Sequence, residues 1–188
     1  MGRLTVICNV TLDGVMQAPG RADEDRRGGF RHGGWAVPYA SDAMNRLMGE
    51  PGDGPGAMLF GRRTYEDFAG FWPHQEPNPF TDALDTMRKY VVSTTLTDPL
   101  PWRNSTVVDV ADVKSLKKEQ HLILMGSGAL VRSLLPHGVI DEFHLLIHPL
   151  VLGSGQRLFG AEGVAASLVL DRVEGTGTGV VIARYRRG

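Results

Sequence analysis

The stretch Leu59-Phe60-Gly61-Arg62-Arg63-Thr64-Tyr65-Glu66 indicates the fold class, because it passes directly from a strand pattern to a helix pattern. Ala57–Phe60 is apolar and strand-like, Gly61 breaks the strand, and Arg62–Phe68 has helical spacing. Two guanidinium groups beside the free N–H donors of a helix start favour a phosphate site. The alternative is an exposed helix start whose arginines point into solvent.

A second strand-to-helix turn lies at Met125-Gly126-Ser127-Gly128-Ala129-Leu130. Leu122–Met125 is expected to be a strand and Ala129–Leu135 a helix, and glycines between them let a phosphate approach backbone N–H groups. As a dinucleotide fingerprint the motif is incomplete, because Val131 stands where the third glycine belongs. A conventional Rossmann protein is therefore disfavoured, and a simple tight turn is the alternative.

A third strand end carries hydroxyl groups. Tyr90–Thr95 is a β-branched strand pattern that ends with Ser93, Thr94 and Thr95. These side chains either close the strand or meet a ligand, since open α/β sheets bind ligands at the carboxyl ends of their strands. Three phosphate-compatible strand ends together indicate a ligand with several phosphates, such as a dinucleotide.

The remaining segments alternate between strand and helix patterns and then become all-strand, which predicts one mixed, mainly parallel sheet with flanking helices and an antiparallel C-terminal edge. We expect a single domain over residues 1–188. The further expected strands are Arg3–Val10, Thr106–Asp109, Asp141–Leu152, Ser167–Val173 and Gly179–Tyr185. The further expected helices are Ser41–Met48, Thr81–Met87 (capped by Thr81) and Ala111–Lys118, and the long loops are Thr11–Trp35 and Phe71–Pro79.

Composition limits the function classes. Of 188 residues, 42% are apolar and 22% charged, and the net charge of −1 gives no electrostatic reason to expect nucleic acid or an anionic membrane as partner. Cys8 is the one cysteine, so it forms no internal disulfide and is expected to be a buried, inert thiol. No signal peptide or membrane-length apolar run is visible, and we expect a cytoplasmic protein.

Two other groups of side chains can be interpreted as either functional or structural. His144 and His148 would share one face of a strand, but no third ligand has suitable spacing, so no metal site is expected. Trp35, Trp72 and Phe71 either stack on a flat heterocycle or anchor loops by packing.

The motifs in their order resemble the dihydrofolate-reductase-like family of the riboflavin-pathway reductase type, as a stand-alone relative. Thr11-Leu12-Asp13-Gly14 is similar to the S-L-D-G opening of that family, and Gly61–Glu66 to its G-R-x-T-W/Y-E segment. The resemblance runs from about Leu4 to Tyr185. It continues through the segments Val92–Leu96, Gly126–Gly128, Ile140–Glu142, Pro149–Gly155 and Leu158–Phe159.

The resemblance implies an enzyme that uses NADPH to reduce a small pterin- or pyrimidine-like heterocycle by hydride transfer. The apolar surface of Asp141–Leu152 and the C-terminal strands, together with the resemblance, predicts a homodimer. The resemblance also implies cofactor contacts at Gly61, Arg62, Arg63, Thr64, Ser93, Thr94, Gly126, Ser127, Gly128, Ala129 and Leu130. Asp13 would lie beside the nicotinamide and substrate, and Asp42 is the candidate acid, with a helix-start carboxylate as its alternative role. The Gly153–Gly155 turn would close part of the pocket.

One family feature is missing. The Asp-x-Pro-x-Leu-x-Arg stretch that grips the ribose phosphate of the riboflavin intermediate is absent, and Phe71-Trp72-Pro73-His74 occupies that region. The substrate is therefore open. Two other functions compete with an NADPH reductase: a nucleotide- or small-molecule-binding protein on the same fold without turnover, and a flavin-dependent reductase.

Overall fold

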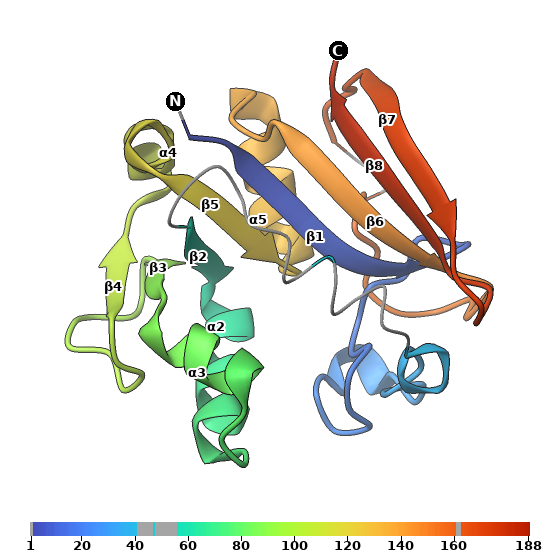
Figure 1. The fold of residues 1–188 in the computed structure, drawn as a ribbon, viewed down its shortest axis with the longest axis horizontal. Coiled ribbons are helices and arrows are strands. Elements are labelled where there is room, and N and C mark those ends of the chain that lie inside the picture. The colour runs from blue at the N-terminus through green and yellow to red at the C-terminus, as the bar shows by residue number, and fades with distance from the viewer. Residues whose placement is uncertain (1, 41–46, 48–55, 161–162) are drawn as a thin grey trace.

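The computed structural model describes residues 2–40, 47, 56–160 and 163–188. Its centre is an eight-stranded sheet with the order β4-β3-β2-β5-β1-β6-β8-β7 (Figure 1). The strands are β1 (Leu4–Thr11), β2 (Gly56–Gly61), β3 (Arg88–Val92), β4 (Ser105–Val108), β5 (His121–Met125), β6 (Glu142–His148), β7 (Leu168–Gly175) and β8 (Val181–Arg187). The sequence-based fold class is confirmed.

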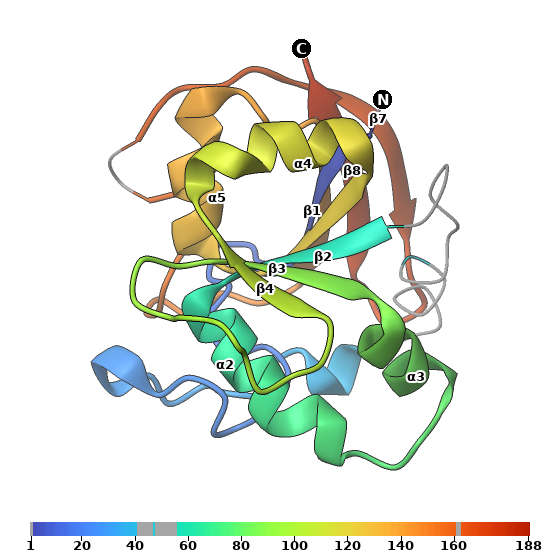
Figure 2. The same ribbon diagram turned by 90° about the vertical axis from the view of Figure 1, so that its left-hand side faces the viewer.

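The α-helices of the described chain connect the parallel strands, and short 3₁₀ turns flank them. The α-helices are α2 (Arg62–Phe71), α3 (Pro79–Thr86), α4 (Val113–Glu119) and α5 (Gly128–Leu134). The 3₁₀ turns are η1 (Arg27–Gly29), η2 (Val37–Tyr39), η3 (Trp72–His74), η4 (Val110–Asp112) and η5 (Leu135–His137). Helices α4 and α5 cover one face of the sheet and α2 and α3 the other (Figure 2).

Strand pairing follows the sequence patterns. The strands from β4 to β6 in the sheet order pair in parallel, with β1 between β5 and β6. Strand β8 then pairs antiparallel with both β6 and β7. Because parallel strands end at the same edge, the segments that follow β1, β2, β3 and β5 meet there.

Strand β2 shows why the sheet is covered on both faces. Its apolar residues are fully buried on alternate sides, with Ala57 and Leu59 in the core beneath α4 and α5. Met58 and Phe60 lie in the core beneath α2 and α3, where Tyr65 and Leu84 pack against them. A continuous apolar run is typical of a strand that is buried on both faces.

Several expected boundaries were wrong. Asn78, and not Thr81, is the N-cap of α3: its side chain accepts from Phe80 N and Thr81 N, while Thr81 completes a capping box from inside the helix. Helix α2 continues to Phe71, so the expected 71–79 loop keeps only its middle part, after η3.

Two strands are shorter than expected. Strand β3 stops at Val92, because the Ser93 hydroxyl accepts from the N–H groups of Thr95 and Leu96 and turns the chain. Strand β6 stops at His148, where Leu150 N bonds back to His148 O. The expected helix 41–48 lies outside the described residues except for Leu47, which is buried and helical.

Membrane insertion through a helix has no support in the described residues. Among them, no helix is both long enough and apolar enough to cross a bilayer.

Candidate active site

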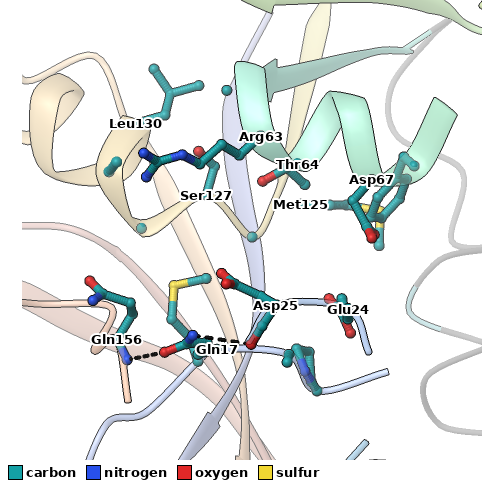
Figure 3. Close-up of a pocket in the computed structure, with 18 of the residues that line it drawn as sticks. Gln17, Glu24, Asp25, Arg63, Thr64, Asp67, Met125, Ser127, Leu130 and Gln156 are labelled. Atoms are coloured by element: carbon teal, nitrogen blue, oxygen red, sulfur yellow. Dashed lines mark hydrogen bonds between the residues drawn. The ribbon is translucent and has the colours of Figure 1, made fainter. Parts of the chain in front are cut away.

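A cavity of about 910 Å³ opens at the carboxyl edge of the sheet. Its floor is formed by Ile7, Cys8 and Asn9 of β1 together with the ends of β2, β3 and β5. The loop after β1 forms one wall, while α2 and the start of α5 form the opposite wall (Figure 3). This is the position at which open α/β sheets bind ligands.

The first turn of α2 presents an arginine to this cavity. Its N-cap, Gly61, is extended and makes no side-chain cap, so the first N–H groups of the helix are not satisfied by a cap. Arg62 Nη1 pairs with Glu66 Oε1 at 3.2 Å one turn later. The Arg63 side chain forms no ion pair or hydrogen bond within the described chain, and its guanidinium reaches toward Ser127 and Leu130 (Figure 3). Of these two arginines, Arg63 is therefore the better placed to bind an anion.

The turn between β5 and α5 lies directly against this helix start. Ser127 has a left-handed backbone, with φ 59° and ψ 66°, and Gly126 has φ 62°. A β-carbon on Gly61 would lie 2.3 Å from Ser127 Oγ, and one on Gly128 would lie 2.7 Å from Met16 Sδ. Glycine at both positions therefore lets three chain segments converge on the cavity.

The cavity floor rests on a buried histidine. His148 Nε2 lies 2.9 Å from Oδ1 of Asn9, and the imidazole makes edge contacts with the Trp35 and Tyr39 rings at 5.0 and 5.6 Å. Burial lowers the pKa of His148 to about 4 and raises the pKa of the Cys8 thiol to about 12. Both groups are neutral at pH 7, so neither supplies charge to the floor.

Gln17 holds the wall formed by the loop after β1. Its amide Nε2 donates to the carbonyls of Asp25 and Arg27 at 3.1 and 3.0 Å, and its Oε1 accepts from Gln156 N at 2.9 Å (Figure 3). The Gln17 carbonyl accepts from Trp35 Nε1 at 2.7 Å. The side chain is 3% exposed, so these bonds are shielded from water.

Glu24 and Asp25 line the cavity from the loop after β1, across from Arg63 and Thr64, and Asp67 lines it from α2 (Figure 3). Arg27 pairs with Asp25 and, mainly by hydrogen bonding, lowers the pKa of that carboxyl. Arg21 pairs with Asp67 and lies 4.2 Å from the centre of the Phe71 ring. Glu24 Oε2 accepts from the N–H groups of Gly20 and Arg21, yet burial raises the pKa of Glu24 overall.

Asp13 is not one of the residues that line the cavity. Its carboxylate accepts from Thr11 Oγ1 at 2.6 Å and from the N–H groups of Leu152 and Gly153 at 3.2 and 2.9 Å. These bonds, that of Thr11 above all, lower the pKa of Asp13 to about 2. In this structure Asp13 ties the loop after β1 to the turn after β6.

The structure brings together most of the residues expected at a cofactor site. Those that line the cavity are Gly61, Arg62, Arg63, Thr64, Gly126, Ser127, Gly128, Ala129 and Leu130. Ser93 and Thr94 follow the lining residue Val92 but do not line the cavity themselves. Trp72 lines it, whereas Trp35 and Phe71 anchor loops. Asp42 lies outside the described residues.

Sequence reasoning missed Gln17, Glu24 and Asp67. The run Asp23-Glu24-Asp25 inside a long glycine-rich loop was the available signal, since such loops are usually functional. Among residues 2–40, 47, 56–160 and 163–188, no group of three or more His, Cys, Asp or Glu side chains could hold a metal ion.

Comparison with known proteins identifies the family. The model of the RibD C-terminal domain matches residues 3–182. The chain belongs to the RibD C-terminal domain family. A curated relative, the uncharacterised protein YyaP of Bacillus subtilis strain 168, is 30% identical over 112 residues, which are 54% of this chain and 58% of that protein. The match therefore spans less than two thirds of that relative.

Solved structures place this RibD C-terminal domain on the dihydrofolate-reductase-like fold. A Shewanella sp. PV-4 protein described as a riboflavin biosynthesis protein has a TM-score of 0.64 and 20% identity, covering 99% of both chains. A pyrimidine reductase-like protein of Corynebacterium diphtheriae has a TM-score of 0.65 and 14% identity, covering 100% of this chain and 92% of that one. Dihydrofolate reductase of Enterococcus faecalis, complexed with NADP(H), has a TM-score of 0.59 and 15% identity, covering 100% and 97%.

Proposed function

We propose that this chain is an NADPH-dependent reductase that acts by hydride transfer on a small pterin- or pyrimidine-like heterocycle. The observation that carries the proposal is the meeting of the α2 start with the 126–128 turn across one cavity. There Arg63, which has no ion pair or hydrogen bond with the described residues, lies beside uncapped N–H groups. Such a combination favours a phosphorylated ligand, and the RibD C-terminal domain family and the dihydrofolate-reductase-like fold support a reductase.

The residues present fit a dinucleotide phosphate. Glycine at 61 and 128 lets the Ser127 and Met16 side chains approach the backbone closely, and Gly126 and Ser127 turn the backbone into the left-handed region beside the cavity. Arg63, Thr64 and Ser127 would hold the phosphates, with Arg62, Ser93 and Thr94 toward the adenosine 2′-phosphate. When bound, the cofactor supplies the hydride. The protein's part is to orient both ligands and exclude water.

The other half of the cavity is suited to a flat heterocycle. Phe68 and Trp72 of the α2–η3 segment contribute apolar and aromatic surface, while Asn9 and the carboxyl groups of the loop wall supply polar contacts. A protein that binds the same ligands without turnover is the second candidate, because fold and pocket alone do not establish chemistry.

We also propose a homodimer that uses the C-terminal sheet edge. Strand β7 is an edge strand within the described sheet, and Val169, Leu170 and Val173 on it are 44–55% exposed. Unpaired backbone groups beside apolar side chains favour pairing with another chain. Light scattering should give the mass of two chains, and a Val173→Lys variant should shift it toward one.

The first experiment is cofactor binding followed by NADPH fluorescence. We expect NADPH to bind much more tightly than NADH. The Arg63→Ala variant should bind NADPH about 10- to 100-fold more weakly, which corresponds to the free energy of one charge-assisted hydrogen bond. Arg62→Ala should weaken NADPH binding less, because Arg62 also pairs with Glu66. Lys114→Ala, on the exposed side of α4, is the matched control.

Failure of both cofactors to bind would end the reductase proposal. If NADPH binds, its oxidation at 340 nm with reducible pterins and pyrimidines separates a reductase from a binding protein. The purified protein should be colourless, and a bound flavin spectrum would instead favour the flavin-dependent alternative.

A further inference from the structure

The carboxyl groups of Glu24, Asp25 and Asp67, which line the cavity, are not equivalent. Asp25 and Asp67 each have an arginine partner, Arg27 and Arg21 respectively. Within the described part of the chain, Glu24 has no ion pair, and its one bonded oxygen, Oε2, accepts only from backbone N–H groups, at 2.7 and 3.1 Å. Of these three carboxyl groups, Glu24 is thus the one without an ion-pair partner among the described residues.

The surroundings of Glu24 raise the pKa of its carboxyl group above the usual value. Burial is the main influence that raises its pKa, and the nearby negative charge of Asp67 adds to it, while the two backbone bonds and Arg21 act in the opposite direction. The other charged groups that line the cavity are Arg26, Arg27, Asp25, Glu66, Arg62, Arg63 and Arg132. Of these, Arg27 and Arg62 are held by their own acidic partners, Asp25 and Glu66.

We propose that Glu24 is the proton donor of the reduction. This rests on the proposed function and supplies its proton donor, because Asp13 does not line the cavity and already carries three hydrogen bonds, and Asp25 and Asp67 are ion-paired. Glu24 faces the cavity from the wall opposite α2 (Figure 3). A ligand between the two walls would therefore contact Glu24 on the side away from Arg63.

The step balances as a two-electron reduction of a C=N or C=O bond. The substrate carbon gains a hydride and forms a new C–H bond, and the π electrons move to the nitrogen or oxygen. As they do, the Glu24 O–H bond breaks and the proton passes to that atom. Glu24 is left as a carboxylate, which regains a proton from water before the next turnover.

This assignment also defines the substrate class. The reducible bond must contain a nitrogen or carbonyl oxygen that can accept the proton, as in a partly oxidised pterin or pyrimidine.

The decisive measurement is a carbon NMR titration of protein labelled with ¹³C at the glutamate carboxyl carbons. The signal that disappears in Glu24→Gln identifies Glu24, and the amide can still accept from Gly20 and Arg21, so the loop should fold. We expect this signal to titrate at higher pH than the other glutamates. If it titrates together with them, the carboxyl has no proton to give at neutral pH and the assignment is overturned.

Activity supplies the second readout, with NADPH and 7,8-dihydropterin as the probe pair. Glu24→Gln should keep NADPH binding within twofold, lower single-turnover hydride transfer about 100-fold or more, and flatten its pH profile. The control is Asp23→Asn, which removes a negative charge from the exposed neighbouring residue. It should leave NADPH binding, hydride transfer and the pH profile unchanged. Full activity in Glu24→Gln, or a loss of hydride transfer in Asp42→Asn instead, would overturn the assignment of Glu24. If the unaltered protein does not bind NADPH at all, the reductase proposal itself is refuted.

Discussion

Ser127 Oγ occupies the space that a β-carbon on Gly61 would need, since the two would be 2.3 Å apart. The relationship joins the β2–α2 turn to the β5–α5 turn, which are distant in sequence and adjacent at the cavity. A side chain at position 61 would therefore force Ser127 Oγ to move. The backbone of Gly61, with φ −81° and ψ 155°, would accept other residues.

Gly61→Ala should destabilise the fold by about 1–3 kcal/mol, the usual cost of overpacking, and should weaken NADPH binding. Adding Ser127→Gly removes the clashing oxygen and suits the left-handed backbone at 127. The double variant should recover most of the unfolding free energy in urea. If it is no more stable than Gly61→Ala alone, the contact does not explain the glycine.

Stability at acid pH should depend on His148. Its pKa is lowered from 6.5 to about 4, so the unfolded chain binds a proton in this range and the folded chain does not. The stabilisation is complete above pH 6.5 and is lost as the pH falls toward 4, by up to about 3 kcal/mol. Urea unfolding of His148→Gln, which can still bond to Asn9, should show a shallower decline over this window. His137→Gln, on the exposed surface, is the control.

Asp13 should affect stability more than the chemical step. Asp13→Asn weakens the bonds from Thr11, Leu152 and Gly153 and should cost about 1–3 kcal/mol, since bonds to a charged group are the strong ones. Because its pKa is lowered to about 2, the stabilisation is present above pH 3.8 and declines as the pH falls toward 2. A pH profile of turnover that loses a limb in Asp13→Asn would instead support a catalytic role.

Gln17→Ala should loosen two loops at once. The Asp25 and Arg27 carbonyls and the Gln156 N–H would each lose a partner, at a total cost of about 2–3 kcal/mol. Amide hydrogen exchange should accelerate in residues 20–30 and 152–157 together. Gln75→Ala, which removes an exposed bond to Phe71 O, should leave both regions unchanged. Faster exchange in only one region would contradict the shared role of Gln17.

Local sequence patterns predicted the sheet and the cofactor half of the cavity, because those features depend on short-range signals. The glycines at 61 and at 126–128 each mark the end of a strand in the sequence. Parallel strands bring their carboxyl ends together at one edge of the sheet. The N-cap at Asn78 was missed because Thr81, three residues on, satisfies the same signature from the other end of a capping box.

The loop wall could not be predicted in the same way. The partners of Gln17 and Asp13 include residues 139 and 140 positions away, and no local pattern indicates which pairs of loops will touch. The unequal surroundings of Glu24 and Asp25 likewise depend on Arg21 and Arg27 and on burial, which require the three-dimensional arrangement.

The bonds of Gln17 to both loops also bear on how relatives of this chain could diverge. An insertion in either the 20–30 segment or the 152–157 segment would displace a backbone group that the same buried amide must satisfy. Changes in the two segments should therefore accumulate together in evolution. A substrate preference carried by this wall would be transferred to another member only by grafting both loops, together with the glutamine beneath them.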